Sequence, residues 1–255
     1  RKCILTNNDC YKRGVTIRPK GIMAHSTGVN NPRLSRYVAP NDGLLGEPSL
    51  RHWNQGGVEV CVHAFIGLLA GGSVAAYQTL PWTMRGWHAG RGSRGSANDT
   101  HISMEICEDG LEDPGYFGTV YREAVELTAH LCREYNLDPL ADGVVICHAE
   151  GYRRGIASNH GDVLHWFPKF GRSMEDFRAD VAHELEGDNL DEQRIRTIVR
   201  EEMAAAEAER AKLPADGWAE QGLAEAKARG ITDGSRPRSY ATRQEVALMV
   251  NAAVK

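Results

Sequence analysis

The sequence predicts an α/β domain in which helices flank a central mixed β-sheet, followed by a helical linker and a small helical C-terminal module. Short apolar runs bounded by glycines or turn residues predict strands in the first part of the chain. Two further segments have apolar residues at helical spacing, one between these runs and one after them. Strands mixed with helices in this way are typical of a sheet covered by helices.

The predicted strands follow one another as residues 58–67, 73–82, 100–109 and 143–148. The glycine pair 71–72 separates the first two, which indicates a hairpin. Apolar residues at helical spacing predict a helix over 119–135. A second helix is expected after Ser173, because Ser173 and Asp176 can form a capping box.

Composition divides the chain into three segments, 1–187, 188–213 and 214–255. The middle segment is rich in Ala, Glu and Arg without Gly or Pro, which favours a helical linker that ends at Pro214. In the last segment, Gly230 is expected to end one helix. Thr242 and Glu245 are expected to cap the next helix.

Composition and charge exclude some classes of partner. The 255 residues carry a net charge of −4, which argues against nucleic-acid binding driven by overall charge and against a polybasic membrane anchor. No run of about 18 apolar residues is present, so no transmembrane helix is expected. The first residues lack the apolar core of a signal peptide, although the chain does not begin with Met and a removed leader stays an alternative.

Six cysteines are spread through the chain without a C-x-x-C pair or a close framework. In a chain of this size, that distribution favours reduced thiols over a disulfide scaffold. Several of the cysteines lie in apolar runs, where a small buried side chain is expected.

Ten histidines are present, and five lie at predicted strand ends or in glycine-rich loops, where functional sites are usually built. These five are His25, His88, His148, His160 and His165. No local zinc motif occurs. His25, His148 and Asp162 have the donor types of a three-ligand zinc site only if the fold brings them together.

Several segments resemble zinc-dependent N-acetylmuramoyl-L-alanine amidases, a family that shares its fold with peptidoglycan-recognition proteins and many phage endolysins. The segment GIMAHSTG at 21–28 resembles the first metal-binding strand of the family. The resemblance continues in order through 62–67, 77–82, 86–90, 96–109, 145–152 and 157–167. Each piece is short, but the ordered set covers about residues 2–185.

The resemblance implies a Zn²⁺ site with His25 as first ligand, His148 as second and Asp162 as third. His160 stands where many members of the family have a catalytic Lys, and a His titrates near neutrality whereas a Lys stays cationic. The alternative is that His160 is the ligand and Asp162 its hydrogen-bonding partner. Glu105 matches the glutamate that faces the metal in the family, and its alternation with apolar neighbours places it on the opposite face from them.

The family implies cleavage of the amide between N-acetylmuramic acid and the L-alanine of the stem peptide in bacterial peptidoglycan. Glu105 is then the general base, and His160 stabilises the oxyanion. Trp87 and His88 are expected to line the substrate groove, with Asn98 and Thr100 as further substrate-binding candidates.

The last segment resembles a single surface-layer-homology motif, from W218-A219 through the D233-G234 turn to T242-R-Q-E245. Such motifs usually bind wall polymer as three copies. Self-association of the chain through this segment into a homo-oligomer is favoured here. A weak wall anchor packed on its own helix and an inert spacer stay as alternatives.

The sequence therefore predicts a peptidoglycan hydrolase, in the form of a phage or prophage endolysin. It is expected to be made in the bacterial cytoplasm and to act on the wall after release or export. A non-catalytic recognition protein of the same fold and a host autolysin are the alternatives. A thiol hydrolase using Cys147 or Cys107 is disfavoured, because strand alternation points Cys147 away from His148.

Overall fold

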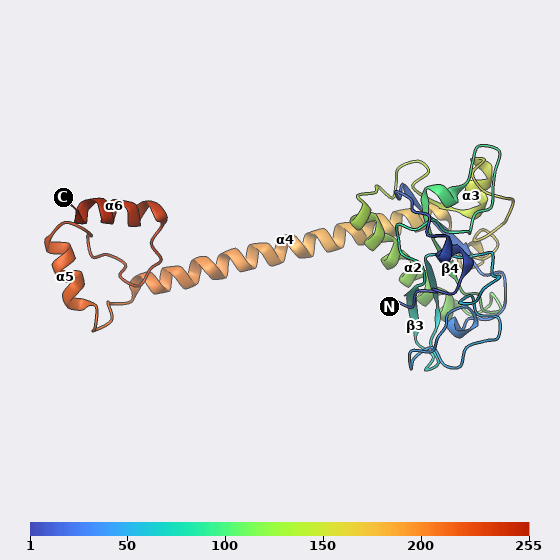
Figure 1. The fold of residues 1–255 in the computed structure, drawn as a ribbon, viewed down its shortest axis with the longest axis horizontal. Coiled ribbons are helices and arrows are strands. Elements are labelled where there is room, and N and C mark those ends of the chain that lie inside the picture. Colours follow the sequence, from blue (N-terminus) through green and yellow to red (C-terminus); the bar gives the residue numbers. More distant parts are fainter. Residues whose placement is uncertain (255) are drawn as a thin grey trace. The chain divides into compact units, whose positions relative to one another are not determined.

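The computed structural model describes residues 1–254, without the side chains of 188–193. Contacts divide the chain into two compact units, Arg1–Gly187 and Asp188–Lys255. The first unit holds the sheet and the helices that cover it (Figure 1). The assignment of roles to 1–187, 188–213 and 214–255 stays a prediction, and the first six side chains of the predicted linker lie outside the described residues.

Five strands form one mixed sheet in the order β3-β2-β4-β1-β5. β1 pairs in parallel with β4 and β5, β2 pairs in parallel with β4, and β2 and β3 form the expected antiparallel hairpin. The fold class predicted from the sequence is confirmed. The strands are β1 Gly21–Ser26, β2 Ala64–Leu68, β3 Val74–Gln78, β4 His101–Ile106 and β5 Val145–Cys147.

One face of the sheet is covered by α2 (Pro114–Tyr135) and by the first turns of α4 (Met174–Lys212). Asp113 caps α2 by accepting hydrogen bonds from the backbone N–H groups of Gly115 and Tyr116. The apolar side chains that alternate along β4 pack in this layer with Phe117 of α2 and Phe177 of α4. Alternation therefore leaves the other side chains of β4 for the opposite face.

The opposite face is covered by the N-terminal segment and by a long irregular segment before β2. Leu5, Tyr37 and Phe65 belong to the buried cluster there, and the rings of Tyr37 and Phe65 stack. The short helices of the first unit are α1 Asp9–Arg13, η1 Leu34–Arg36, η2 Ala97–Asp99, α3 His148–Arg153 and η3 Phe167–Phe170.

Two elements differ from the sequence expectation. The strand expected from residue 58 begins only at Ala64, because Cys61 forms a separate antiparallel bridge with Trp87. The helix after Ser173 and the predicted linker helix form one helix, α4, which continues through Gly187 to Lys212. Its capping box is confirmed, since Asp176 N–H donates to Ser173 Oγ and Ser173 N–H donates to Asp176 Oδ2.

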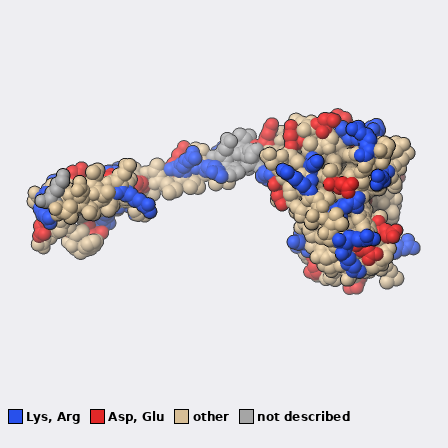
Figure 2. Space-filling model, turned by 45° about the horizontal axis from the view of Figure 1, so that its top comes forward, with Lys and Arg blue, Asp and Glu red and all other residues tan. Residues whose placement is uncertain are grey.

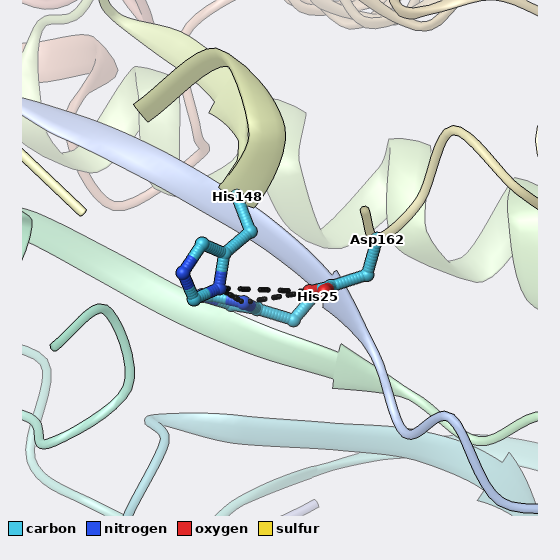
Figure 3. A group of neighbouring side chains, drawn as sticks. All are labelled: His25, His148 and Asp162. Carbon is cyan, nitrogen blue, oxygen red and sulfur yellow. Dashed lines mark hydrogen bonds and ion pairs between the residues drawn. The ribbon is translucent and has the colours of Figure 1, made fainter. Parts of the chain in front are cut away.

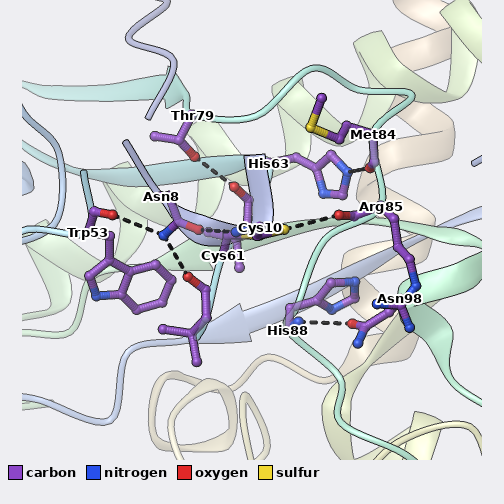
Figure 4. Close-up of a disulfide and its surroundings, with 12 residues drawn as sticks. Asn8, Cys10, Trp53, Cys61, His63, Thr79, Met84, Arg85, His88 and Asn98 are labelled. Atoms are coloured by element: carbon purple, nitrogen blue, oxygen red, sulfur yellow. Dashed lines mark hydrogen bonds between the residues drawn. A yellow bond between two sulfur atoms is a disulfide. The ribbon is translucent and has the colours of Figure 1, made fainter. Parts of the chain in front are cut away.

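The sequence favoured reduced thiols over a disulfide scaffold, and this is wrong for two of the six cysteines. Cys10 and Cys61 form a disulfide across a sequence separation of 51 residues (Figure 4). Their spacing gave no signal, because the fold alone brings α1 beside the segment before β2. Cys3, Cys107, Cys132 and Cys147 are free.

The second unit contains α5 (Glu220–Ala228) and α6 (Arg243–Ala253). Thr242 and Glu245 form the expected capping box of α6. Gly230 adopts a positive φ of 69° just after α5, as the sequence predicted for a helix end. No residue over 194–254 is buried.

Lys, Arg, Asp and Glu side chains are interspersed over the face of the first unit shown in Figure 2. Among the described residues, no helix has both the length and the apolar character that crossing a bilayer requires.

Candidate active site

The candidate site lies at the carboxyl ends of β1, β4 and β5, the edge where open α/β sheets bind ligands. His25 near the end of β1 is paired in register with Glu105 of β4. His148 begins α3 directly after β5, and Asp162 lies in the loop between α3 and η3. Three parallel strands thus carry residues that are far apart in the sequence to one edge.

His25, His148 and Asp162 form a compact group of possible metal ligands (Figure 3). Nδ1 of His25 lies 3.1 Å from Oδ2 of Asp162 and 3.1 Å from Nδ1 of His148. Nδ1 of His148 lies 3.7 Å from the same carboxylate oxygen. The three atoms therefore form a nearly equilateral triangle, which we call the donor triangle.

The other nitrogen of each ring determines which atoms carry protons. Nε2 of His148 lies 3.3 Å from Ser158 Oγ, whose own proton is donated to the carbonyl of Ala89. Nε2 of His25 lies 2.9 Å from Nδ1 of His88. When both Nε2 atoms donate, both Nδ1 atoms present lone pairs to each other and to a carboxylate. Three electron-rich atoms at such short range repel one another unless a cation or a shared proton lies between them.

The donor triangle fits zinc in both chemistry and size. Two imidazoles and a carboxylate are a ligand set of catalytic zinc sites, which keep a fourth position for water or substrate. Zinc bonds of about 2.0–2.1 Å in tetrahedral geometry separate two ligand atoms by about 3.4 Å. The three separations in the triangle bracket this value. Asp162, and not His160, completes the group.

The protonation states also favour a cation. Burial, with a further contribution from His25, lowers the pKa of His148 to about 4, so its ring is neutral near pH 7. Burial raises the pKa of Asp162, but the hydrogen bond and positive charge that His25 supplies when its ring is protonated outweigh burial, so this pKa lies below its usual value. A neutral imidazole and an ionised carboxylate are the forms that bind metals.

Glu105 faces the same pocket from β4. Its Oε2 is shielded from solvent, and no polar atom within the described part of the chain lies in hydrogen-bonding distance of it. Burial, followed by the charges of Asp162 and Glu108, raises the pKa of Glu105 well above its usual value. A carboxyl group with a raised pKa beside a possible metal site is suited to accept and return a proton near neutral pH.

The pocket has a volume of 730 Å³. Trp87, His88, Asn98 and His160 line it together with Glu105 and the donor triangle. The exposed ring of His160 stacks on His148 at a centroid distance of 4.7 Å. This places His160 beside the possible metal site but outside the donor triangle.

Two of the predicted substrate-binding residues have local structural partners. Oδ1 of Asn98 accepts hydrogen bonds from the backbone N–H groups of His88 and Ala89, so it fixes the segment that carries His88. Thr100 is not among the residues that line the pocket, and its hydroxyl lies 2.8 Å from Nδ1 of His101. His101 Nε2 in turn lies 3.0 Å from the carbonyl oxygen of Gly143.

Sequence reasoning missed several residues around the pocket. Ser158 orients His148, and Glu108 accepts hydrogen bonds from Gly28 N–H and from His165. Glu59 and Arg85 also line the pocket. Ser158 and Glu108 lie within the segments that carry the family resemblance, but single polar residues give no periodic signal.

A family model described as N-acetylmuramoyl-L-alanine amidase matches residues 16–163, more than half of the chain. A search of curated proteins gave no match.

Several solved structures are similar to this chain. The hydrolase AmiA of Staphylococcus aureus in complex with its ligand is 18% identical, with a TM-score of 0.48 over 66% of this chain and 73% of that one. The PlyG catalytic domain is 22% identical, with a TM-score of 0.48 over 72% and 94%. A mutant endolysin from Bacillus subtilis is 21% identical, with a TM-score of 0.46 over 71% and 98%.

Proposed function

The chain belongs to the N-acetylmuramoyl-L-alanine amidase family, and from this membership we propose that it is a zinc-dependent peptidoglycan amidase. It cleaves the amide between the lactyl group of N-acetylmuramic acid and L-alanine. The donor triangle is the observation that supports this proposal most. In it, the possible ligand atoms of His25, His148 and Asp162 lie at separations that suit a zinc ion, and Glu105 lines the same pocket.

In the proposed reaction, His25, His148 and Asp162 hold the zinc ion. When bound, zinc supplies Lewis acidity that polarises the amide carbonyl and lowers the pKa of water. Glu105 takes the proton of the attacking water and delivers it to the leaving nitrogen of L-alanine. His160, exposed beside His148, donates a hydrogen bond to the oxyanion. Trp87 gives the pocket an aromatic side chain that suits a sugar or peptide backbone.

Mass spectrometry of isolated cell wall digested by the protein, with and without a chelator, tests this function. We expect new free L-alanine amino termini that disappear with the chelator and return with added zinc. Wall binding without new amines contradicts the amidase and favours the non-catalytic recognition protein. New reducing sugar ends mean that a glycosidic bond is cut instead.

We also propose that the second unit associates with copies of itself. No side chain over 194–254 is buried, although Trp218 and Leu248 are large, apolar and exposed. A unit without a buried core gains little stability from the hydrophobic effect alone, so contact with another surface is expected. Aliphatic side chains such as Leu248 suit a protein partner better than a polar wall polymer.

Sedimentation of the full chain tests the association. We expect a mass above that of the monomer, and Leu248→Glu should lower it to the monomer. The matched control is Leu50→Glu, at a fully exposed leucine of the first unit, which should leave the mass unchanged. A monomeric full chain at all concentrations contradicts association. The 780 Å³ pocket beside Tyr240 and Arg236 then makes wall-polymer binding the next candidate.

The biological setting follows the family resemblance. We propose a phage or prophage endolysin that reaches the wall after release, with a host autolysin as the alternative. Expression of the protein inside a bacterium separates the two. An endolysin should lyse the cells only when a membrane-permeabilising protein is induced with it, whereas an exported autolysin should act without one.

A further inference from the structure

One side of the active-site pocket consists of two backbone segments that are joined to each other. Glu59 and Val60 belong to one of them, and Arg85 and Trp87 belong to the other. Cys61 and Trp87 exchange two backbone hydrogen bonds, of 3.1 and 3.0 Å. His88, whose backbone N–H donates to Asn98 Oδ1, follows the second segment, and we call 59–61 and 85–87 together the pocket wall. No strand of the main sheet includes either of them.

Three consecutive side chains of the N-terminal segment, Asn8, Asp9 and Cys10, hold the pocket wall and the residues just before it, and we call them the N-terminal staple. Figure 4 shows Asn8 and Cys10 with their partners. Asn8 is completely buried, and its amide donates to the carbonyls of Trp53 and Val60 at 2.9 and 3.0 Å. The Oδ1 atom of Asn8 accepts from Cys10 N–H, so each polar atom of this side chain has a partner.

Cys10 makes the covalent link of the staple. Its disulfide partner is Cys61, and its Sγ also lies 3.1 Å from the carbonyl oxygen of Arg85. Both halves of the pocket wall are therefore in contact with this one residue. Asp9 Oδ2 accepts from Gly57 N–H at 2.9 Å and holds the same segment two residues before Glu59.

Among the described residues, no hydrogen bond, ion pair or disulfide joins the N-terminal staple to the donor triangle. The ring of His88 does bond to His25, but Asn98, and not the staple, holds the backbone of His88. His25 is positioned by β1, and His148 is positioned by the start of α3 directly after β5. Both residues therefore lie at the edge of the main sheet. The arrangement thus separates two tasks. The sheet edge places the possible metal ligands, and the N-terminal staple places the wall against which the substrate lies.

We propose that the Cys10–Cys61 disulfide is a positioning link for the substrate-binding wall, and that its reduction by a dithiol weakens substrate binding while metal binding is retained. In the reduction, a thiolate of the dithiol attacks one sulfur and the S–S bond breaks. The second thiolate of the reagent then attacks the mixed disulfide and releases the remaining cysteine as a thiolate. Cys10 and Cys61 end as thiols after gaining two electrons and two protons, and the dithiol ends as a cyclic disulfide. This inference rests on the amidase function proposed above.

The experiment compares oxidised and dithiothreitol-reduced protein below both melting temperatures, with alkylated thiols counted by mass to verify reduction. We expect KM for a muropeptide to rise on the order of tenfold, as for the loss of about one substrate hydrogen bond. We expect kcat and zinc affinity to stay within about twofold, because Asn98 still holds His88 beside His25 when the staple is released. Reoxidation should restore KM. If reduction instead raised KM by unfolding and aggregating the protein, reoxidation would not restore it.

Two sets of variants isolate the staple. Cys10→Ser with Cys61→Ser should show the raised KM and no further response to reductant, whereas Cys3→Ser, at a free cysteine, should behave as the parent protein. If the double variant does not fold, Asp9→Ala carries the test, because it removes the Gly57 contact together with one exposed ion pair, to Lys12. Asp9→Ala should raise KM less than reduction does. Lys12→Ala, which removes the ion pair and keeps the Gly57 contact, should not raise it.

Equal KM in the fully reduced and oxidised states overturns the proposal, as does a parallel loss of zinc affinity. Absence of cleavage in both states contradicts the amidase function instead. In that case, calorimetric binding of the muropeptide to Glu105→Gln in the two redox states still tests the staple. Equal affinities there overturn it.

Discussion

The hydrogen bond between His25 and His88 provides a direct test of the site. Substituting His88→Phe keeps a planar ring but removes the Nδ1 acceptor, which lies 2.9 Å from His25 Nε2. His25 is only 1% exposed, so water cannot easily replace that acceptor. In the metal-free variant, His25 can shift its proton to Nδ1 and donate to Asp162. Metal binding at Nδ1 forces the proton back onto Nε2, where it has no partner.

The cost therefore falls on the metal-bound form. A buried donor without a partner costs about 1–3 kcal/mol. Because about 1.4 kcal/mol is a factor of ten, zinc affinity should fall by about 10–100-fold, the range known for residues that orient metal-bound histidines. The stability of the metal-free protein should change much less.

Competition with a chromophoric chelator measures this affinity. His130→Phe is the matched control, because His130 is an exposed histidine of α2 far from the site in the fold. An unchanged zinc affinity in His88→Phe would refute the reasoning, as would an equal loss in the control. Nitrogen NMR of the His25 ring gives a second readout, since its Nε2–H signal should move only in His88→Phe.

Four further outcomes are expected. His148→Ala should abolish zinc binding and cleavage together, as measured by calorimetry and by release of L-alanine amino termini; cleavage without zinc binding contradicts the metal site. Glu105→Gln should lower kcat by about 10²–10⁴-fold while zinc affinity is kept, because it removes only the general base. In the metal-free protein, the raised pKa of Glu105 means that the folded chain keeps a proton that the unfolded chain releases. Stability should therefore fall as pH rises from the usual carboxyl range through that raised pKa, and Glu105→Gln should remove this slope in urea titrations at several pH values. Reduction of Cys10–Cys61 should lower the free energy of unfolding by about 4 kcal/mol, the chain-entropy value for a separation of 51 residues; an unchanged urea midpoint contradicts this estimate.

Residue patterns predicted the sheet well where periodicity is strong. The alternation in 101–106 correctly separated Ile102, Met104 and Ile106 from Glu105, because one face of β4 packs on α2. The capping boxes at Ser173 and Thr242 were also predictable, since they depend on residues only three positions apart.

Features that depend on long-range contacts were harder to predict. Patterns in the residues left His25, His148 and Asp162 as separate candidates, and only the family resemblance suggested that they meet. The structure brings them together, but their roles stay predictions. The disulfide was missed because no local signal links Cys10 to Cys61. The use of Asn98 as a backbone acceptor was missed because its partners lie nine and ten residues away.

The position of β1 in the sheet determines when the donor triangle can form during synthesis of the chain. β1 is the first strand made, yet its two neighbours are formed by residues 101–106 and 145–147. Long-range pairing of this kind delays folding relative to local helices. A nascent chain that ends before Asp162 lacks a complete donor triangle at any zinc concentration. If the proposed function holds, such a truncated product can neither bind zinc at this site nor cleave the wall.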